Sequence, residues 1–589
     1  MARNRFDVDE RLESPFNIKH LMRAGVYLKN YSGKMILSLV LSLLSAITGL
    51  LGPLMVQRAL NVAVPEKDVK QLILLAVALL VSIAVSVWLA TWRSRIMIVV
   101  GQDIIYDIRT DLFSHLQKLS FQFYDDRPHG KILTRVINYV NGVSDALSNG
   151  IINFVLEIFN LIIIAIFMFI CNVQLAFIVI AGVPVFLIVV FLLKNAQRKS
   201  WQDVSNKSSN LNAYLHESLE GMKITQVFTR EEENAEIFDK LNMKYRKSWM
   251  KAQYTSKLIQ FFVDNIATWV VGTMYIVGLM LLGPAMQIGT LIAIASYAWR
   301  FWQPILQLSN LYNTFINAVA YLERIFELLD EPIQVDDEKD AIELPPITGQ
   351  VTFEDVTFSY DGKMNILEHF DLQVKKGESI ALVGPTGAGK TTVVNLLSRF
   401  YNINEGRLLL DEYDIAKVTL HSLRSQVGIM LQDSFIFSGT IMDNIRYGKL
   451  DATDEQVMQA AKTVCAHEFI VEMEKGYETE VNERGSRLSQ GQKQLIALAR
   501  TLLSDPSILI LDEATSSIDA KTERQLQAGI QALLKGRTSF IIAHRLSTIK
   551  NSDKILYIAN KGIAEIGSHD ELLAKQGLYW QLYTSQLEE

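Results

Sequence analysis

Cysteine is nearly absent from this chain of 589 residues, which contains only Cys171 and Cys465. The two lie far apart and without metal-ligand spacing, so we interpret them as buried, reduced thiols rather than as a disulfide or a metal site. An excess of basic residues is also missing. The net charge is −6 at pH 7, which argues against nucleic acid as the main partner. Residues 1–30 lack the apolar core of a signal peptide, so we expect the N-terminus to stay in the cytoplasm.

Charge is missing altogether from four long stretches of the first half, namely residues 35–57, 71–92, 158–193 and 265–299. The first two are each long enough to cross a membrane once as a helix. The last two are too long for one helix, and polar breaks at residues 171–174 (CNVQ) and 283–290 (GPAMQIGT) divide each of them in two. The sequence therefore predicts an all-α transmembrane domain with six spans.

Lys and Arg are concentrated in residues 92–150 and 194–257, and they are absent from the two polar breaks. The positive-inside rule places these basic segments and both termini in the cytoplasm. Both segments have a helical pattern, and a helix pair of this length would project about 40 Å from the bilayer. We expect the turns of these arms near residues 120–131 and 213–223, where they are placed to contact a soluble domain. The alternative is a pair of solvated hairpins without partners.

The second half of the chain has the pattern of a soluble α/β domain. After a charged linker at residues 330–346, strand-like and helical patterns alternate. Buried strands are expected at residues 379–384, 506–514 and 538–544. Such an alternation predicts a parallel sheet that binds ligands at the carboxyl ends of its strands. The predicted organisation is a cytoplasmic segment, a transmembrane domain, a linker and a soluble α/β domain, at residues 1–34, 35–325, 326–349 and 350–589.

The stretch GPTGAGKTT matches the phosphate-loop pattern G-x-x-x-x-G-K-[ST], and it follows an apolar strand and opens a helix. The candidate nucleotide-binding residues are Gly384, Pro385, Thr386, Gly387, Ala388, Gly389, Lys390, Thr391 and Thr392. We expect Lys390 to reach the β- and γ-phosphates of ATP and the Thr391 hydroxyl to bind Mg²⁺. A chance Gly-rich turn or a dinucleotide site is the weaker interpretation.

Other candidate residues follow strand-like runs. Asp512 and Glu513 end the strand ILILDE; Asp512 is expected to hold Mg²⁺, and Glu513 to orient or deprotonate the attacking water. His544 ends another apolar strand and is placed to contact the γ-phosphate or Glu513. Gln432 could reach the metal or the water, and Tyr360 could stack on a base. A structural role is the alternative for each of them.

Taken in order, six spans, Tyr360, the phosphate loop, Gln432, LSQGQ, LDEATSSID and His544 resemble the ABC exporter family. The chain looks like a bacterial half-transporter of the multidrug type, and the resemblance covers nearly its whole length. It implies a cytoplasmic-membrane protein with an α/β P-loop ATPase domain, ATP and Mg²⁺ as cofactors, Mg²⁺ bound by Thr391, Gln432 and Asp512, and catalysis by Glu513, His544 and Gln432.

The resemblance also assigns Tyr360 to adenine stacking and Gln432 to the connection with the membrane half. The signature residues Ser489, Gly491 and Gln492, with Asp519, then close on ATP held by a second ABC half-transporter chain, and Glu483 lies near the coupling contacts. The signature departs from the family pattern L-S-G-G-Q because Gln490 replaces a glycine. A tolerated change is one explanation. A heterodimer with one competent and one degenerate site is the explanation we favour over a homodimer.

Charged residues within or beside the spans indicate a substrate site. They are Glu157, Asp264 and Arg300, and aromatic residues surround Arg300. Interhelical ion pairs and lipid contact are the alternatives. We expect export of an amphipathic small molecule, drug-like or lipid-like. The competing interpretations are a lipid or peptide exporter and an ATP-gated channel. Glu513 and His544 argue against the channel, because they indicate ATP turnover.

Overall fold

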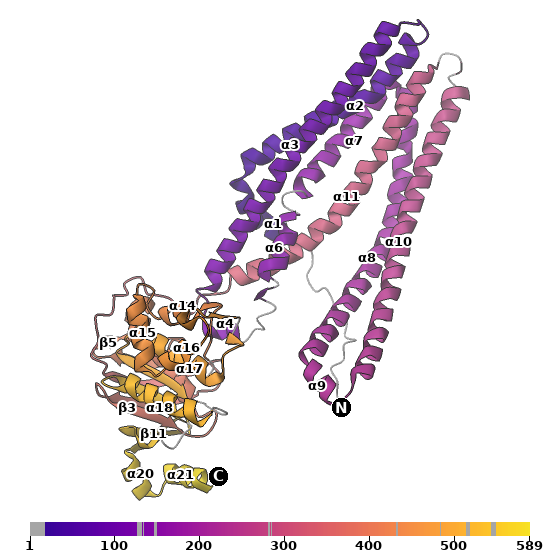
Figure 1. The fold of residues 1–589 in the computed structure, drawn as a ribbon. Coiled ribbons are helices and arrows are strands. Elements are labelled where there is room, and N and C mark those ends of the chain that lie inside the picture. Colours follow the sequence, from indigo (N-terminus) through magenta and orange to yellow (C-terminus); the bar gives the residue numbers. More distant parts are fainter. Residues whose placement is uncertain are drawn as a thin grey trace. The chain divides into compact units, whose positions relative to one another are not determined.

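The structure, a computed structural model, describes residues 18–125, 132–133, 135–145, 150–280, 283, 286–431, 434–482, 485–513, 519–543 and 549–588. The chain divides into two compact units (Figure 1). Unit 1 comprises Met1–His115 and Gly130–Asp330, and unit 2 comprises Leu116–His129 and Glu331–Glu589. A short piece of the first half of the chain therefore belongs to the same unit as the second half.

Unit 1 is helical throughout the part that the structure describes. Its elements are α1 (Ile18–Lys29), α2 (Ser32–Arg58), the short π-helix η1 (Ala59–Ala63), α3 (Val69–Leu116), the short π-helix η2 (Arg135–Tyr139), α6 (Val140–Asp145), α7 (Ile151–Cys171), α8 (Val173–Glu220), α9 (Met222–Val227), α10 (Glu231–Met280) and α11 (Ile288–Leu329). The last turn of α3 reaches Leu116, the first residue of unit 2.

Helices α8 and α10 of unit 1, like α3 and α11, are much longer than a membrane crossing requires. α8 has 48 residues and α10 has 50, so each is about 70 Å long, against roughly 30 Å for the hydrocarbon core. The two run side by side, and the short helix α9 lies in the connection between them (Figure 1). The connection falls at residues 221–230, slightly later in the chain than the sequence predicts.

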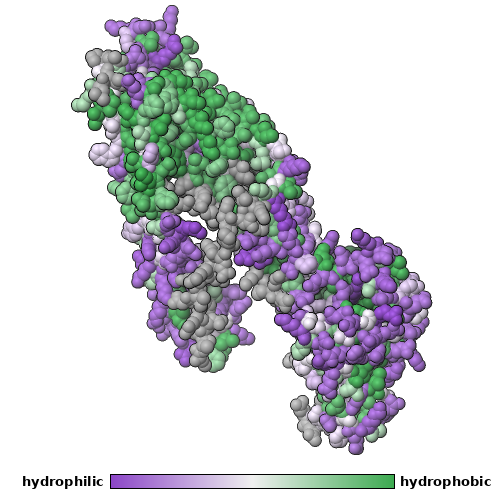
Figure 2. All heavy atoms as spheres, turned by 180° about the vertical axis from the view of Figure 1, so that it is seen from behind, coloured by the Kyte–Doolittle hydropathy of each residue, from purple (hydrophilic) through white to green (hydrophobic). Residues whose placement is uncertain are grey.

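Five helical segments of the described residues are long and apolar enough to cross a membrane: Ser32–Ala63, Val69–Leu116, Ile152–Cys171, Val173–Glu220 and Glu231–Met280. The sixth predicted span corresponds to α11, which does not belong to this set. Its apolar stretch is interrupted by Arg300 and Gln303, and it packs along α2 and α7, so much of its surface faces protein rather than lipid. Figure 2 shows the hydrophobic surface gathered over one end of these long helices.

The predicted break CNVQ is a helix boundary in the structure. Asn172 has an extended backbone conformation, and its side-chain oxygen accepts a hydrogen bond from the backbone N–H of Leu175. An asparagine in this position caps the new helix and satisfies one of its free N–H groups. The chain therefore ends α7 and starts α8 within two residues.

Unit 2 contains a four-stranded sheet of order β2-β1-β4-β5, a six-stranded sheet of order β12-β11-β3-β10-β9-β6 and the pair β7-β8. The strands are β1 (Val351–Phe358), β2 (Leu367–Val374), β3 (Ser379–Val383), β4 (Glu405–Leu410), β5 (Tyr413–Asp414), β6 (Val427–Met430), β7 (Gly439–Thr440), β8 (Glu480–Val481), β9 (Ile508–Glu513), β10 (Thr538–Ala543), β11 (Lys554–Ala559) and β12 (Gly562–Gly567). In the larger sheet β11, β3, β10, β9 and β6 are parallel, and β12 is antiparallel.

The helices of unit 2 are α4 (Phe121–Asp125), α12 (Lys390–Leu397), α13 (Leu420–Gln426), α14 (Ile441–Arg446), α15 (Asp454–Thr463), α16 (His467–Val471), α17 (Gln490–Leu503), α18 (Ala520–Leu534), α20 (His569–Lys575) and α21 (Leu578–Glu588). Every residue of β10 is buried, and β3 is buried from its second residue on. The expected parallel sheet with buried central strands is confirmed, because β3, β9 and β10 occupy the three predicted positions.

Candidate ATP-binding and catalytic site

Four parallel strands of unit 2 end at one edge of the six-stranded sheet. The register pairs Leu382 of β3 with Ile542 of β10, and Ile542 with Asp512 of β9. On the far side of β9, Met430 of β6 pairs with Leu511. Because parallel strands point the same way, the carboxyl ends of β3, β9, β10 and β6 all lie at this edge, where ligands of such sheets bind.

The loop after β3 has the backbone that a phosphate cradle requires. Gly384, Gly387 and Gly389 all have positive φ angles, of 139°, 82° and 104°. At Gly384 an added Cβ would lie 2.3 Å from the carbonyl oxygen of Ile558, so no side chain fits there. Gly389 is the N-cap residue of α12, and the free N–H groups at such a helix N-terminus favour the binding of an anion.

Lys390 lies inside this loop. Its Nζ atom donates hydrogen bonds to the carbonyl oxygens of Gly384, at 2.7 Å, and Pro385, at 3.0 Å. Burial lowers the pKa of the Lys390 ammonium group, while the Asp512 carboxylate acts in the opposite direction. The carboxylate at the end of β9 thus favours the charged form of Lys390 in the phosphate loop.

The residues expected to bind magnesium have suitable chemistry. Thr391 is exposed in the first turn of α12, and the half-buried Asp512 ends its strand at the same edge of the sheet. Mg²⁺ is bound typically by one or two protein oxygens together with the phosphates of its nucleotide. A hydroxyl and a carboxylate beside a phosphate loop therefore fit this metal.

Tyr360 lies beside the phosphate-loop helix. Its hydroxyl is 3.1 Å from Oγ1 of the buried Thr392, and its ring makes edge contacts with Phe358 and Tyr401, with centroids 4.8 and 4.9 Å apart. The ring is half-buried. An aromatic ring held in this way presents a fixed surface on which a base can stack.

The signature segment forms the start of a helix. Ser489 precedes α17, its Oγ accepts a hydrogen bond from the Gln492 backbone N–H, and the Gln492 side chain accepts one from the Ser489 backbone N–H. This reciprocal capping box fixes the helix N-terminus. Gln490 is exposed in the first turn and does not have a positive φ angle, so replacing glycine there does not strain the backbone. Gly491, by contrast, is buried.

Asp519 also caps a helix, because its carboxylate accepts hydrogen bonds from the backbone N–H groups of Lys521 and Thr522 at the start of α18. A hydrogen bond from the Thr522 side chain, together with these backbone N–H groups, lowers the pKa of the Asp519 carboxyl group. Gln432, Glu483 and His544 lie outside the described residues. Glu513 is described as the last residue of β9, but its side chain is outside the described part.

The sequence analysis expected the turn near residues 120–131 to contact a soluble domain, and the structure confirms this for α4 but adds partners that the sequence did not identify. Gln122 donates a hydrogen bond from Nε2 to the Tyr360 carbonyl oxygen at 3.1 Å, and Asp125 accepts one from the Tyr401 hydroxyl at 2.9 Å. The ring of Phe121 contacts that of Phe400, with centroids 4.3 Å apart. The only sequence signal was the expected turn near residues 120–131. Unit 2 thus holds α4 against the tyrosine that we expect to stack on the base.

The three charged residues of the predicted substrate site lie on three different helices of unit 1. Glu157 of α7 accepts a hydrogen bond from Asn160 at 3.3 Å, and Asp264 of α10 accepts one from Gln260 at 2.9 Å. Arg300 of α11 donates to the carbonyl oxygen of Gly49 in α2, at 2.9 Å. Within the described part of the chain these three residues do not form ion pairs with one another.

The chain combines a phosphate loop, a strand-end carboxylate and a second capped helix N-terminus with helices that can span a membrane. Together these features define an ATP-driven membrane transporter. Family comparisons give the same class. The family described as the ABC transporter transmembrane region matches residues 35–305, and the family described as ABC transporter matches residues 367–516. The chain belongs to the ABC transporter family, as an exporter whose transmembrane and ATP-binding domains are fused and whose ATPase is coupled to transport.

Three relatives illustrate this membership. The ABC transporter ATP-binding protein YknV of Bacillus subtilis is 40% identical over 593 residues, which cover 99% of this chain and 97% of that protein. A fatty acid ABC transporter ATP-binding/permease protein of Mycobacterium bovis is 36% identical over 520 residues, which cover 87% and 81%. The structure of a bacterial Atm1-family ABC exporter with ATP bound matches with a TM-score of 0.79 and 29% identity, over 95% of this chain and 98% of that one.

Proposed function

We propose that this chain is one half of a dimeric exporter that uses ATP hydrolysis to move amphipathic small molecules, drug-like or lipid-like, out of the bacterial cytoplasm. The observation that carries the proposal is the sheet edge of unit 2, where the phosphate loop and Asp512 meet on a chain with membrane-spanning helices. In this proposal the ATP-binding domain and both termini lie on the cytoplasmic side, as the basic segments of unit 1 predict.

The proposed chemistry assigns one task to each residue of the edge. Lys390 and the loop N–H groups hold the phosphates, and Tyr360 stacks on adenine. Thr391, Gln432 and Asp512 hold Mg²⁺, which supplies charge neutralisation at the transferred phosphoryl group. Glu513 orients or deprotonates the attacking water, and His544 contacts the γ-phosphate.

A second chain completes the site in this proposal. The signature residues Ser489, Gly491 and Gln492, and also Asp519, belong to segments separate from the phosphate loop. We propose that they close on the nucleotide of the partner. Two exposed apolar surfaces support dimer formation: the tip of the α8–α10 pair and an aromatic cluster of unit 2, with Ile224, Val227, Phe228, Phe435, Phe437 and Tyr447 exposed. Large exposed apolar patches typically mark interfaces.

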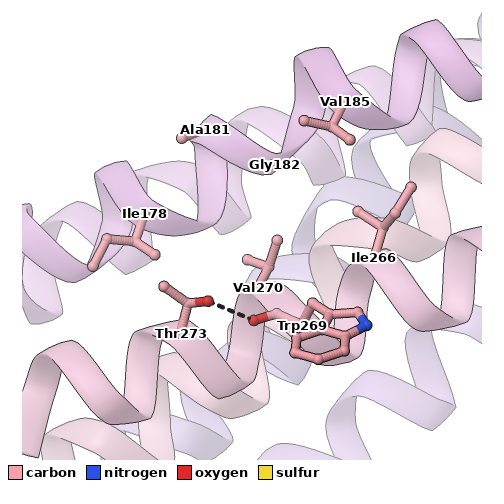
Figure 3. A pocket seen from close by; sticks show the side chains of 8 residues that line it. All are labelled: Ile178, Ala181, Gly182, Val185, Ile266, Trp269, Val270 and Thr273. Atoms are coloured by element: carbon pink, nitrogen blue, oxygen red, sulfur yellow. Dashed lines mark hydrogen bonds between the residues drawn. The ribbon is translucent and has the colours of Figure 1, made fainter.

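The substrate class is supported by an apolar pocket in unit 1 (Figure 3). Its volume is about 510 Å³, and Ile178, Ala181, Gly182 and Val185 of α8 and Ile266, Trp269, Val270 and Thr273 of α10 line it. The one hydroxyl among them, that of Thr273, already donates to the Trp269 carbonyl oxygen at 2.9 Å. The rest of the lining is mostly apolar, with the indole N–H of Trp269 as a further polar group, and such a lining suits the hydrocarbon part of an amphiphile. The fatty acid relative is consistent with this class of substrate.

The experiment that tests the proposal measures ATP hydrolysis by the chain alone in liposomes, with Glu513→Gln as the blank. Removing a general base lowers the rate by roughly 10²- to 10⁴-fold. Activity above the blank would show that two identical chains suffice. If the chain binds ATP but does not hydrolyse it until a second half-transporter is added, the heterodimer is correct. If neither condition gives hydrolysis, the proposed catalytic role is wrong.

A second measurement separates a pump from a channel. Transport of a labelled amphiphile is followed in wild type and in Glu513→Gln with ATP present. A pump stops when hydrolysis stops, whereas an ATP-gated channel continues to conduct in the variant. Continued flux in Glu513→Gln would overturn the export mechanism.

A further inference from the structure

Pro53 creates a local defect in the membrane-spanning helix α2. A proline in a helix interior has no N–H group, so the carbonyl oxygen four residues earlier loses its usual hydrogen-bond partner. Here that residue is Gly49. In a membrane an unsatisfied carbonyl group is costly, so another donor has to reach it.

The donor comes from α11. Nη1 of Arg300 is 2.9 Å from the carbonyl oxygen of Gly49, and one turn earlier the Tyr297 hydroxyl donates to the carbonyl oxygen of Leu50 at 2.5 Å. Tyr297 is fully buried, whereas Arg300 is exposed. The guanidinium group is therefore anchored to the backbone of α2 at one edge, while the rest of the side chain remains accessible.

The charge lies deep in the span. Gly49 is 17 residues from the start of α2 and Arg300 is 12 residues from the start of α11, which correspond to roughly 25 and 18 Å along their helices. A charge at that depth normally has a counter-charge. Among the residues that the structure describes, no carboxylate forms an ion pair with Arg300. Satisfying the Gly49 carbonyl group needs only one N–H donor, so this contact alone does not explain a cation.

We propose that Arg300 binds the anionic head group, a carboxylate or a phosphate, of the amphiphile that the chain exports. This inference rests on the proposed function and narrows its substrate class from amphiphiles in general to anionic ones. A guanidinium group has five N–H donors in a planar fork, and one is used on Gly49. The remaining donors can pair with two oxygens of one anion. The anchor on α2 holds the fork in place before the substrate arrives, which reduces the entropy lost on binding.

The test measures direct binding of four probes with the same alkyl chain to the nucleotide-free protein in nanodiscs: dodecanoate, dodecyl phosphate, dodecanol and dodecyltrimethylammonium. In Arg300→Gln, which keeps a donor for Gly49 but removes the charge, we expect affinity for the anionic probes to fall roughly ten- to a hundredfold. Affinity for dodecanol should stay within about twofold. The probe that loses more affinity identifies the head group as carboxylate or phosphate.

Two further variants separate binding from helix support. Pro53→Ala restores the N–H group that pairs with the Gly49 carbonyl oxygen. If Arg300 only supported the helix, it would be dispensable in the double variant Pro53→Ala/Arg300→Gln, and anion binding would return to the wild-type value. If binding stays low, the charge itself binds the ligand. Arg246→Gln makes the same substitution at an exposed arginine of α10 that belongs to no proposed site; it is the matched control and should leave anion affinity within about twofold.

Three outcomes would overturn the inference: equal losses for all four probes, recovery of anion binding in the double variant, or no binding of either anion by wild type. Failure of the proposed function gives a different pattern. If wild type binds the anions through Arg300 but its ATPase is not stimulated and no probe is transported, the export proposal fails while the anion site stands.

Discussion

Gly384 shows how a single residue sets the geometry of the phosphate loop. Its φ of 139° is a conformation that residues with a Cβ rarely adopt, and a Cβ would lie 2.3 Å from the Ile558 carbonyl oxygen of the neighbouring strand β11. Both problems arise at the backbone, so a rotamer change cannot relieve them. The residue fixes where β3 ends and where the cradle begins.

We therefore predict that Gly384→Ala lowers the free energy of unfolding of unit 2 by about 2–4 kcal/mol and abolishes binding of a fluorescent ATP analogue. Gly362→Ala is the matched control, because Gly362 has φ of 69° but no atom within 4 Å of the added Cβ. It should cost about 1 kcal/mol and leave nucleotide binding intact. Equal effects of the two variants in thermal unfolding would show that crowding at Ile558 is not the cause.

For single residues, the sequence predicted the role correctly where the chemistry requires a particular residue type. The glycines, Lys390 and Asp512 follow from the phosphate-loop pattern and from carboxylates at a strand end. Partners set by tertiary packing were not predictable. The hydroxyl of Thr392 meets Tyr360 across 32 positions, and Arg300 meets Gly49 across 251, and no local pattern records either pair.

Among the elements, α4 shows what the sequence could and could not predict. The expected contact between the end of the first arm and a soluble domain is present, but the sequence did not predict that the segment forms a five-residue helix within unit 2. Such a short helix is not stable alone, so its contacts must hold it. These are the ring pair Phe121–Phe400 and the hydrogen bonds from Gln122 and to Asp125. The length and pattern of apolar residues predicted the positions of five spans and three strands well, because every residue along such an element contributes to the pattern.

We predict that Tyr401→Phe, which removes only the hydroxyl that donates to Asp125, weakens the docking of α4 by about 1 kcal/mol. Amide hydrogen exchange in residues 116–125 should rise roughly fivefold, while the basal ATPase rate stays within about twofold. Tyr477→Phe is the control, because it removes a comparable hydrogen bond, to His467 at 2.9 Å, elsewhere in unit 2. Unchanged exchange in Tyr401→Phe would show that ring packing alone holds α4.

For the whole molecule, the sequence predicted both folds and their order, because a membrane half and an ATPase half differ in composition. Assembly was less accessible. The preference for two different chains rested on Gln490, and the structure gives that residue an ordinary helical backbone in the capped first turn of α17. Gln490 is therefore compatible with an intact signature helix, and the ATPase rate of the chain alone distinguishes a homodimer from a heterodimer.

We predict complementation between two inactive variants. Lys390→Ala disables the phosphate loop, and Ser489→Arg places a bulky cation at the start of α17. If each site combines the loop of one chain with the signature of another, a mixed dimer has one intact site. Co-reconstitution should then restore up to about a quarter of the wild-type ATPase rate when assembly is random. Each variant alone is the control, and no recovery in the mixture would contradict a site shared between identical chains.

The membership of residues 116–129 in unit 2 has a consequence for biosynthesis. A ribosome releases this segment several hundred residues before the last strands of unit 2, and at about 5–20 residues per second the delay is on the order of half a minute or more. During that time Phe121 has no aromatic partner, because Phe400 and Tyr401, which lie between α12 and β4, have not yet folded into unit 2. The final folding step of the ATPase is thus the capture of a segment made early, and an ATPase expressed from residue 331 onward would lack it.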